Sequence, residues 1–152
     1  MQRGMAKYLG RYSLRSIQER DLSRLTTLLE QLSVVGEVPR EKLVSFYKSV
    51  STNPSHDVTV VVDETDTVCA CATLIIEPKL LHAGRSVGHI EDVVVDLTLR
   101  NQGIGRFLIT SLIERARNND CYKVILDTDP DTAEFYKKCG MKQKGLMMAI
   151  YF

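Results

Sequence analysis

The chain has 152 residues, of which 44% are hydrophobic and 26% are charged, and its formal net charge is +1. This length and composition predict one soluble domain, residues 1–152, with enough apolar residues for a core. A net charge so close to zero gives no reason to expect nucleic acid or an anionic membrane as a partner, and no apolar run approaches the roughly 18 residues of a membrane span. Residues 1–7 lack the apolar stretch of a signal peptide. We therefore expect a cytoplasmic protein, with import into an organelle left open.

The cysteine pattern argues against a disulfide framework and against a zinc site. The four cysteines are Cys69, Cys71, Cys121 and Cys139. Without a secretory signal, disulfides are not expected. The Cys-x-Cys spacing at 69–71, with no second pair, is poor for zinc. We expect four small buried side chains and no metal.

The hydrophobic pattern predicts strands and helices along the whole chain. In the first half we expect a strand at 8–15, a helix at 21–32, a helix from Pro39 that Asn53-Pro54 closes, and a hairpin of strands at 58–62 and 68–76. After a polar connection we expect a strand at 88–95, a helix at 106–117, a strand at 123–126, a short helix at 133–139 capped by Gly140, and an apolar strand at 146–152. This order predicts an α+β domain.

The most informative motif is Arg100-Asn101-Gln102-Gly103-Ile104-Gly105, which lies between a predicted strand and a predicted helix. A glycine-rich turn that opens a helix presents free backbone N–H groups and the positive end of the helix dipole at one place, which suits a pyrophosphate. The motif lacks the Lys-Ser/Thr of a Walker loop and the third glycine of a dinucleotide fingerprint. Taken alone, it fits a structural turn equally well.

The motif resembles the coenzyme A loop of the GNAT superfamily of N-acetyltransferases. Further segments resemble the glucosamine 6-phosphate N-acetyltransferase family within it, and the likeness extends from about Leu14 to Met148. These segments are Leu32–Gly36, Glu77–His82, Gly88–Val95, Asn119–Asp127 and Glu134–Met141.

The resemblance implies the GNAT fold, a mixed and mostly antiparallel central sheet flanked by helices. It also implies direct transfer of an acetyl group from acetyl-CoA to the 2-amine of glucosamine 6-phosphate, a step that leads to UDP-N-acetylglucosamine. The family needs no metal and forms homodimers, with sugar sites built from both chains.

The catalytic residues that the resemblance implies are Asp127, Tyr136 and Asp92. Asp127 matches an acid that orients the amine or takes its proton, and Tyr136 matches a phenol beside the CoA sulfur. Adjacent carboxylates on an alternating strand face opposite sides, so we expect one of Glu91 and Asp92 to point inward and to need a partner or a ligand. Asp127 also fits a turn or cap ahead of Pro130.

The acetyl-CoA contacts that the resemblance implies come from the strand backbone, the glycine loop and the last helix. They are Val93, Val94, Val95, Arg100, Asn101, Gln102, Gly103, Ile104, Gly105, Arg106, Thr132 and Tyr136. The pyrophosphate is expected to rest on backbone N–H groups between Asn101 and Arg106, with Arg100 and Arg106 beside it. Thr132 stands where the family usually has an asparagine.

The implied sugar-phosphate contacts are Ser33, Lys79, Leu80, Leu81, His82, Glu91, Asp92, Tyr122, Lys123 and Tyr151. The family usually has an arginine near its C-terminus for the phosphate, whereas residues 148–152 here contain no Arg or Lys. Tyr151 replaces it, or the phosphate relies on Lys79, His82 and Lys123. Two alternatives stay open: a GNAT enzyme for another small amine or a protein N-terminus, and a non-catalytic acetyl-CoA-binding module.

Overall fold

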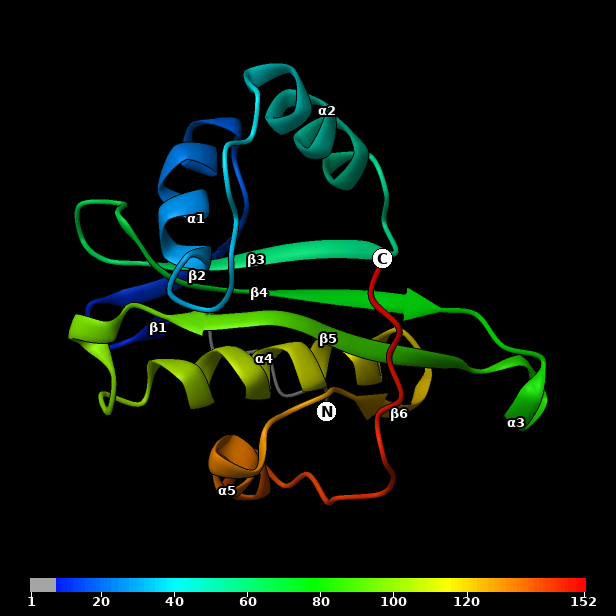
Figure 1. Cartoon of the computed structure of the whole chain (residues 1–152). Helices are drawn as coiled ribbons and strands as arrows, with labels where there is room; N and C mark the ends of the chain where they lie inside the picture. The colour runs from blue at the N-terminus through cyan, green and yellow to red at the C-terminus, as the bar shows by residue number, and fades with distance from the viewer. Residues whose placement is uncertain (1–7) are drawn as a thin grey trace.

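The computed structural model describes residues 8–152 (Figure 1). Residues 1–7, in which the sequence predicts no signal peptide, lie outside the described residues. One sheet of six strands runs through the described chain in sequence order. Its strands are β1 (Tyr8–Leu9), β2 (Tyr12–Ser16), β3 (His56–Val62), β4 (Val68–Glu77), β5 (Ser86–Val95) and β6 (Cys121–Ile125). Neighbouring strands are antiparallel except β5 and β6, which are parallel. The predicted α+β class with a mixed, mostly antiparallel sheet is confirmed.

Helices cover both faces of this sheet. They are the 3-10 turns η1 (Glu19–Asp21) and η2 (Leu97–Leu99), and the helices α1 (Leu22–Leu29), α2 (Arg40–Ser51), α3 (Leu81–Gly84), α4 (Ile104–Asn118) and α5 (Pro130–Lys138). Figure 1 shows α1 and α2 above the sheet, and α4 and α5 below it. No helix in the described residues is long and apolar enough to cross a membrane.

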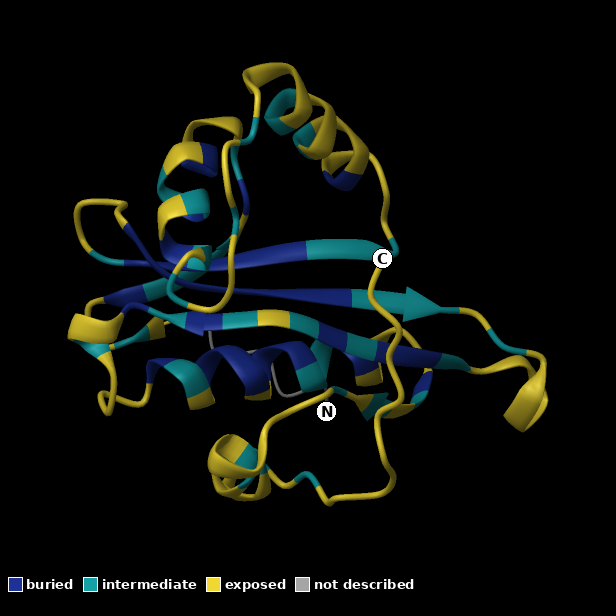
Figure 2. Ribbon diagram, in the orientation of Figure 1, coloured by how far each residue is buried: buried dark blue, intermediate teal, exposed yellow. Residues whose placement is uncertain are grey.

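The sheet separates two hydrophobic clusters, and Figure 2 shows the buried residues concentrated in the strands and on the helix faces turned toward them. On the α1–α2 side, Leu25 and Leu28 pack with Val60 of β3. On the α4 side, Leu108 and Leu112 pack with Leu74 of β4. Because β3 and β4 are covered on both faces, their sequences are nearly continuous apolar runs rather than alternating ones.

Gly88, in the Gly-His-Ile-Glu-Asp segment, is needed for this packing. A Cβ at Gly88 would lie 3.1 Å from the Cβ of Ala116, 3.2 Å from Leu74 Cδ1 and 3.3 Å from Val124 Cγ2. Three elements (α4, β4 and β6) therefore close on the backbone of β5 at this point. The contact fixes β5 against α4 just before the carboxylates that follow.

Two expected strands differ from the structure. The strand expected at 8–15 is a hairpin of β1 and β2, because Gly10 has a φ of +55° and turns the chain. The strand expected at 146–152 is wrong for the single chain. Residues 141–152 have no regular structure, and Leu146 and Phe152 are fully exposed. A strand needs a neighbouring backbone to accept its hydrogen bonds, and this segment pairs with no described strand of its own chain.

Candidate active site

The candidate site forms around a point where β5 has one residue more than its neighbour β4. Thr73 of β4 stands opposite Glu91 and Cys71 stands opposite Val94, so Asp92 and Val93 together face one residue of β4. This is a β-bulge. It shows in the packing, since Ile90 and Val93, three residues apart, both contact the α4-side cluster. Strict alternation would have placed them on opposite faces.

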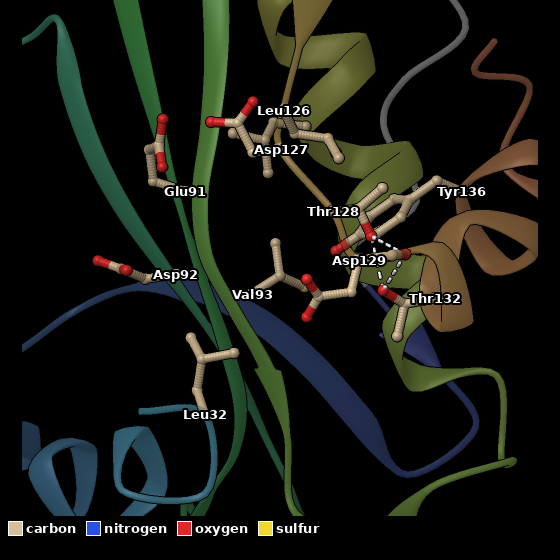
Figure 3. A pocket seen from close by; sticks show the side chains of 11 residues that line it. Leu32, Glu91, Asp92, Val93, Leu126, Asp127, Thr128, Asp129, Thr132 and Tyr136 are labelled. Atoms are coloured by element: carbon tan, nitrogen blue, oxygen red, sulfur yellow. Dashed lines mark hydrogen bonds between the residues drawn. The ribbon is translucent and has the colours of Figure 1, made fainter. Parts of the chain in front are cut away.

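The bulge changes the direction of the two adjacent acids. Asp92 has a φ of +52°, in the left-handed region that side chains other than glycine, asparagine and aspartate rarely adopt. Its carbonyl oxygen accepts a weak hydrogen bond from the Cys71 thiol, at 3.8 Å. The expectation that Glu91 and Asp92 face opposite sides is therefore wrong: both line one pocket (Figure 3).

This pocket opens where β5 and β6 part. The two strands pair only between Ser86–His89 and Cys121–Ile125. Beyond that point β5 continues on one side and the chain after β6 on the other, which leaves a cavity of about 280 Å³. It is lined by Leu32, Ile90, Glu91, Asp92, Val93, Leu126, Asp127, Thr128, Asp129, Thr132 and Tyr136.

The charge in the pocket is negative. Four carboxylates line it, those of Glu91, Asp92, Asp127 and Asp129, and no basic side chain is among its lining residues. Burial, followed by the charges of Asp127 and Asp92, raises the pKa of the Glu91 carboxyl. A site of this kind favours a positively charged ligand, such as the ammonium form of an amine.

Tyr136 supplies the pocket with a hydrogen-bond donor. Its ring packs edge-on against Phe135, with ring centroids 4.9 Å apart. Burial raises the pKa of the Tyr136 phenol. The phenol therefore stays protonated at neutral pH and can donate a hydrogen bond or a proton.

Asp127 is not the residue that caps α5. The helix begins at Pro130, and its N-cap is Asp129, whose backbone carbonyl accepts from the N–H groups of Thr132 and Ala133 at 3.1 Å each. Beside it, the hydroxyls of Thr128 and Thr132 lie 2.6 Å apart (Figure 3). The N-cap position of α5, which the sequence also allowed for Asp127, is thus occupied by Asp129. The Asp127 carboxylate instead lines the pocket.

The glycine loop has a shape that fits a diphosphate. Asn101 and Gly103 both have left-handed backbones, with φ of +63° and +82°, and Gly103 is the N-cap of the 15-residue helix α4. The free N–H groups of the first turn of α4 therefore follow directly on a tight turn. A Cβ at Gly105 would lie 3.1 Å from Phe135 Cζ, so this glycine lets α4 approach α5. The predicted Arg100 and Arg106 flank the loop in sequence.

The predicted sugar-phosphate residues other than Glu91 and Asp92 lie outside this pocket. Lys79, Leu80, Leu81, His82, Tyr122 and Lys123 gather around α3 and the start of β6. The His82 ring stacks on Tyr122 with centroids 3.9 Å apart, and the Lys123 ammonium lies 5.5 Å from the centroid of the same ring. In Figure 1, α3 projects from the far end of the β4–β5 hairpin. Ser33 and Tyr151 are exposed and do not line the pocket either.

Several residues that line the pocket are not among the residues predicted from the sequence. Leu32, Ile90, Leu126, Thr128 and Asp129 line the pocket but were not predicted as site residues. Each lies within three residues of a predicted one, and Leu32, Ile90 and Leu126 also lie in segments that carry the family resemblance; these are the signals that could have found them. Among the predicted strand contacts, Val93 lines the pocket, whereas the Val94 side chain packs in the α1–α2 cluster.

The chain is similar in sequence to known acetyltransferases. A family model described as the Acetyltransferase (GNAT) family matches residues 12–141. The chain is 37% identical over 143 residues to the glucosamine 6-phosphate N-acetyltransferase of Candida albicans, an alignment that covers 93% of this chain and 96% of the relative. It is 37% identical over 127 residues to the enzyme of the same name from Arabidopsis thaliana, covering 82% of this chain and 85% of that protein.

Two crystal structures extend the likeness to the fold. The glucosamine-6-phosphate N-acetyltransferase of Arabidopsis thaliana superimposes with a TM-score of 0.86 at 34% identity, covering 93% of this chain and 98% of its own. An acetyltransferase of Trypanosoma brucei gives the same TM-score, 0.86, at 34% identity and covers 93% of this chain and 99% of its own. The predicted GNAT fold is confirmed.

The raised pKa of Glu91 predicts an unusual dependence of stability on pH. A carboxyl whose pKa is higher in the folded state contributes stability that is complete below its unfolded value of 4.5 and is lost as the pH rises through the folded value. We expect Glu91→Gln to raise Tm by about 1–2 °C at about pH 7.5 and by nothing near about pH 4, as thermal unfolding would show.

Glu134 provides the matched control. Lys137 lowers the pKa of the Glu134 carboxyl, so Glu134→Gln should lower Tm slightly, or leave it unchanged, at the higher pH. A Glu91→Gln variant no more stable than the wild type at either pH would contradict the idea of an uncompensated charge in the pocket.

Proposed function

The chain belongs to the GNAT family of acetyltransferases, and we propose that it transfers the acetyl group of acetyl-CoA to the 2-amine of D-glucosamine 6-phosphate. It is an acyltransferase, with relatives that carry the name of this activity. The observation that carries the choice of an amine acceptor is the pocket with four carboxylates, which is lined by residues of β5, the strand that precedes the glycine loop in sequence. Its product, N-acetylglucosamine 6-phosphate, would then serve UDP-N-acetylglucosamine synthesis.

The glycine loop and β5 would hold the acetyl donor. The N–H groups at the start of α4, with Arg100 and Arg106, bind a diphosphate through charge-assisted hydrogen bonds. Acetyl-CoA supplies an activated acetyl thioester. Because the bulge at Asp92 and Val93 takes one residue of β5 out of the ladder, a backbone N–H is left there to polarise the thioester carbonyl.

Some side chains of the pocket would bind and deprotonate the acceptor, and another would protonate the leaving group. Glu91 and Asp92 hold the amino sugar, whose bound ammonium group gives one proton to solvent and becomes the neutral amine that attacks the thioester. Asp127 orients this amine and takes a second proton from it as the new N–C bond forms. Tyr136 donates a proton to the sulfur as the C–S bond breaks, so that the thiol leaves neutral. Both residues line the same cavity, as these two proton transfers require.

The phosphate of the acceptor needs cations, and the pocket of one chain has none among its lining residues. We propose that two copies of the chain form a homodimer and that Lys79, His82 and Lys123 of one copy complete the pocket of the other. The apolar, exposed segment 146–152 supports this arrangement, since a second copy would provide the strand partner that it lacks.

The first test is the release of CoA thiol from acetyl-CoA in the presence of glucosamine 6-phosphate or glucosamine. We expect turnover with the phosphorylated sugar and a kcat/KM at least about tenfold lower with glucosamine, because the phosphate contacts are charge-assisted. Equal values for the two sugars would contradict the phosphate part of the proposal. No turnover with either sugar would contradict the acceptor.

Tyr136→Phe tests the leaving-group role. Removal of the phenol should lower kcat about 10- to 100-fold while CoA binding stays within about twofold, because general-acid catalysis acts only in the transition state. Steady-state kinetics and calorimetry separate the two effects. The matched control is Tyr47→Phe on α2, which removes a hydroxyl away from the pocket and should leave kcat unchanged. An undiminished kcat in Tyr136→Phe would refute the assignment.

A complementation experiment tests the shared site. Asp127→Asn removes a pocket group, whereas Lys79→Ala/Lys123→Ala removes the cations around α3, and each variant alone should be nearly inactive. If each site combines the pocket of one chain with the cations of the other, equal co-expression should restore about a quarter of wild-type activity, because half of the dimers are mixed and each has one intact site. Sites contained within one chain would give no gain over the separate variants.

A further inference from the structure

The turn that joins β5 to the glycine loop is fixed by one buried carboxylate. Asp96 Oδ1 accepts hydrogen bonds from the Thr98 N–H at 3.0 Å and the Thr98 hydroxyl at 2.8 Å. The Asp96 N–H donates to the Cys69 carbonyl at 2.9 Å. The two hydrogen bonds from Thr98, together with the Arg24 guanidinium, lower the pKa of the Asp96 carboxyl to about 2. Asp96 therefore holds η2 against the start of β4 at every physiological pH.

Helix α1 reaches the same turn with Arg24. The Arg24 guanidinium pairs with Asp96 Oδ2, and its Nε donates to the Val68 carbonyl at 3.1 Å. One arginine thus joins α1, the start of β4 and the carboxylate that organises η2. The position of η2 relative to α1 is set by contacts from three elements.

A second contact comes from the turn that follows α1. The Gln31 amide oxygen accepts a hydrogen bond from the Leu97 N–H at 2.8 Å, across 66 positions in the sequence. Leu97 is the first residue of η2, and three residues after it the chain enters Arg100–Gly105. The residue after Gln31 is Leu32, which lines the acidic pocket. The segment that borders the acceptor is thus bonded to the turn that carries the donor loop.

We propose that Gln31 and Asp96 are positioning residues for acetyl-CoA. They hold η2 in one place against α1, and through η2 they set the position of the loop whose N–H groups bind the diphosphate. Neither residue lines the pocket, so they act through the loop and not on the reacting atoms. This inference rests on the proposed function, because it assumes that the loop binds the CoA diphosphate.

Gln31 gives the sharper test because its side chain is not buried and the core does not depend on it. Gln31→Met keeps the length of the side chain and removes the acceptor, whereas Gln31→Glu keeps an acceptor oxygen. Thr27→Val, in the helix α1 just before this turn, removes an exposed hydrogen bond to the Ser23 carbonyl that does not reach η2. The three variants separate the contact to η2 from a general effect on α1.

The dissociation constant of CoA, measured by calorimetry, is the primary readout. We expect it to rise about three- to tenfold in Gln31→Met and to stay within about twofold of the wild type in Gln31→Glu and Thr27→Val. The KM for acetyl-CoA should rise with it in Gln31→Met, while kcat at saturation changes less than about twofold. Asp96→Asn should shift KM in the same direction.

The outcomes separate this inference from the proposed function. A wild-type chain that binds no CoA would refute the proposed function. A wild type that binds CoA while Gln31→Met binds it equally well would refute the positioning role alone. Equal losses of affinity in Thr27→Val and Gln31→Met would also refute it, because they would show a general effect of loosening α1.

Discussion

The site depends on the parting of β5 and β6. The two parallel strands pair over only the first residues of β5, and Gly88 lies in this paired stretch, where α4, β4 and β6 crowd against its backbone. From there, β5 must keep its other neighbour, β4, while β6 leads away toward α5. Backbone N–H and C=O groups inside a sheet are costly when they lack hydrogen-bond partners, unless a ligand or water replaces the missing strand. The cavity between the two chain segments is therefore a consequence of sheet topology. Most of the side chains that line it come from the residues of β5 and of the chain after β6 that follow the paired stretch.

Charge then decides what this cavity can hold. Four carboxylates line it, and burial, together with the charges of Asp127 and Asp92, raises the pKa of Glu91. Repulsion among these charges makes the pocket less stable than an uncharged one of the same shape. A protonated amine would relieve this repulsion on binding. The glycine loop, which follows β5 in sequence, has the opposite preference, since free N–H groups open α4 there and Arg100 and Arg106 flank the loop in sequence. The negative pocket thus attracts a cationic acceptor, and the positive loop attracts an anionic donor.

Much of this arrangement could be predicted from the sequence, because helical periodicity marks α1 and α4, and apolar runs mark the strands β3 to β5. The chemistry-bearing residues Asp127 and Tyr136 also came from sequence, through the resemblance, and both line the pocket. Two features could not be predicted. The alternation rule assumes that each residue of a strand stands opposite one residue of its neighbour. It therefore does not predict the bulge at Asp92, and it gives the wrong direction for the side chains of Glu91 and Asp92. The apolar pattern at 146–152 is that of a strand, but pattern alone does not say which chain provides its partner.

The bulge also restricts which amino acid can occupy position 92. Its φ of +52° excludes residues that resist the left-handed region, and the β-branched residues most of all. Glycine and asparagine would fit this backbone at little strain, but neither carries a charge. Glutamate would keep the charge, but it lacks the short side chain that hydrogen-bonds locally and makes this conformation accessible. Aspartate alone among the standard residues combines both properties. Position 92 is thus constrained by local geometry and by chemistry at once, whereas Glu91, on regular extended backbone, is constrained by its chemistry alone.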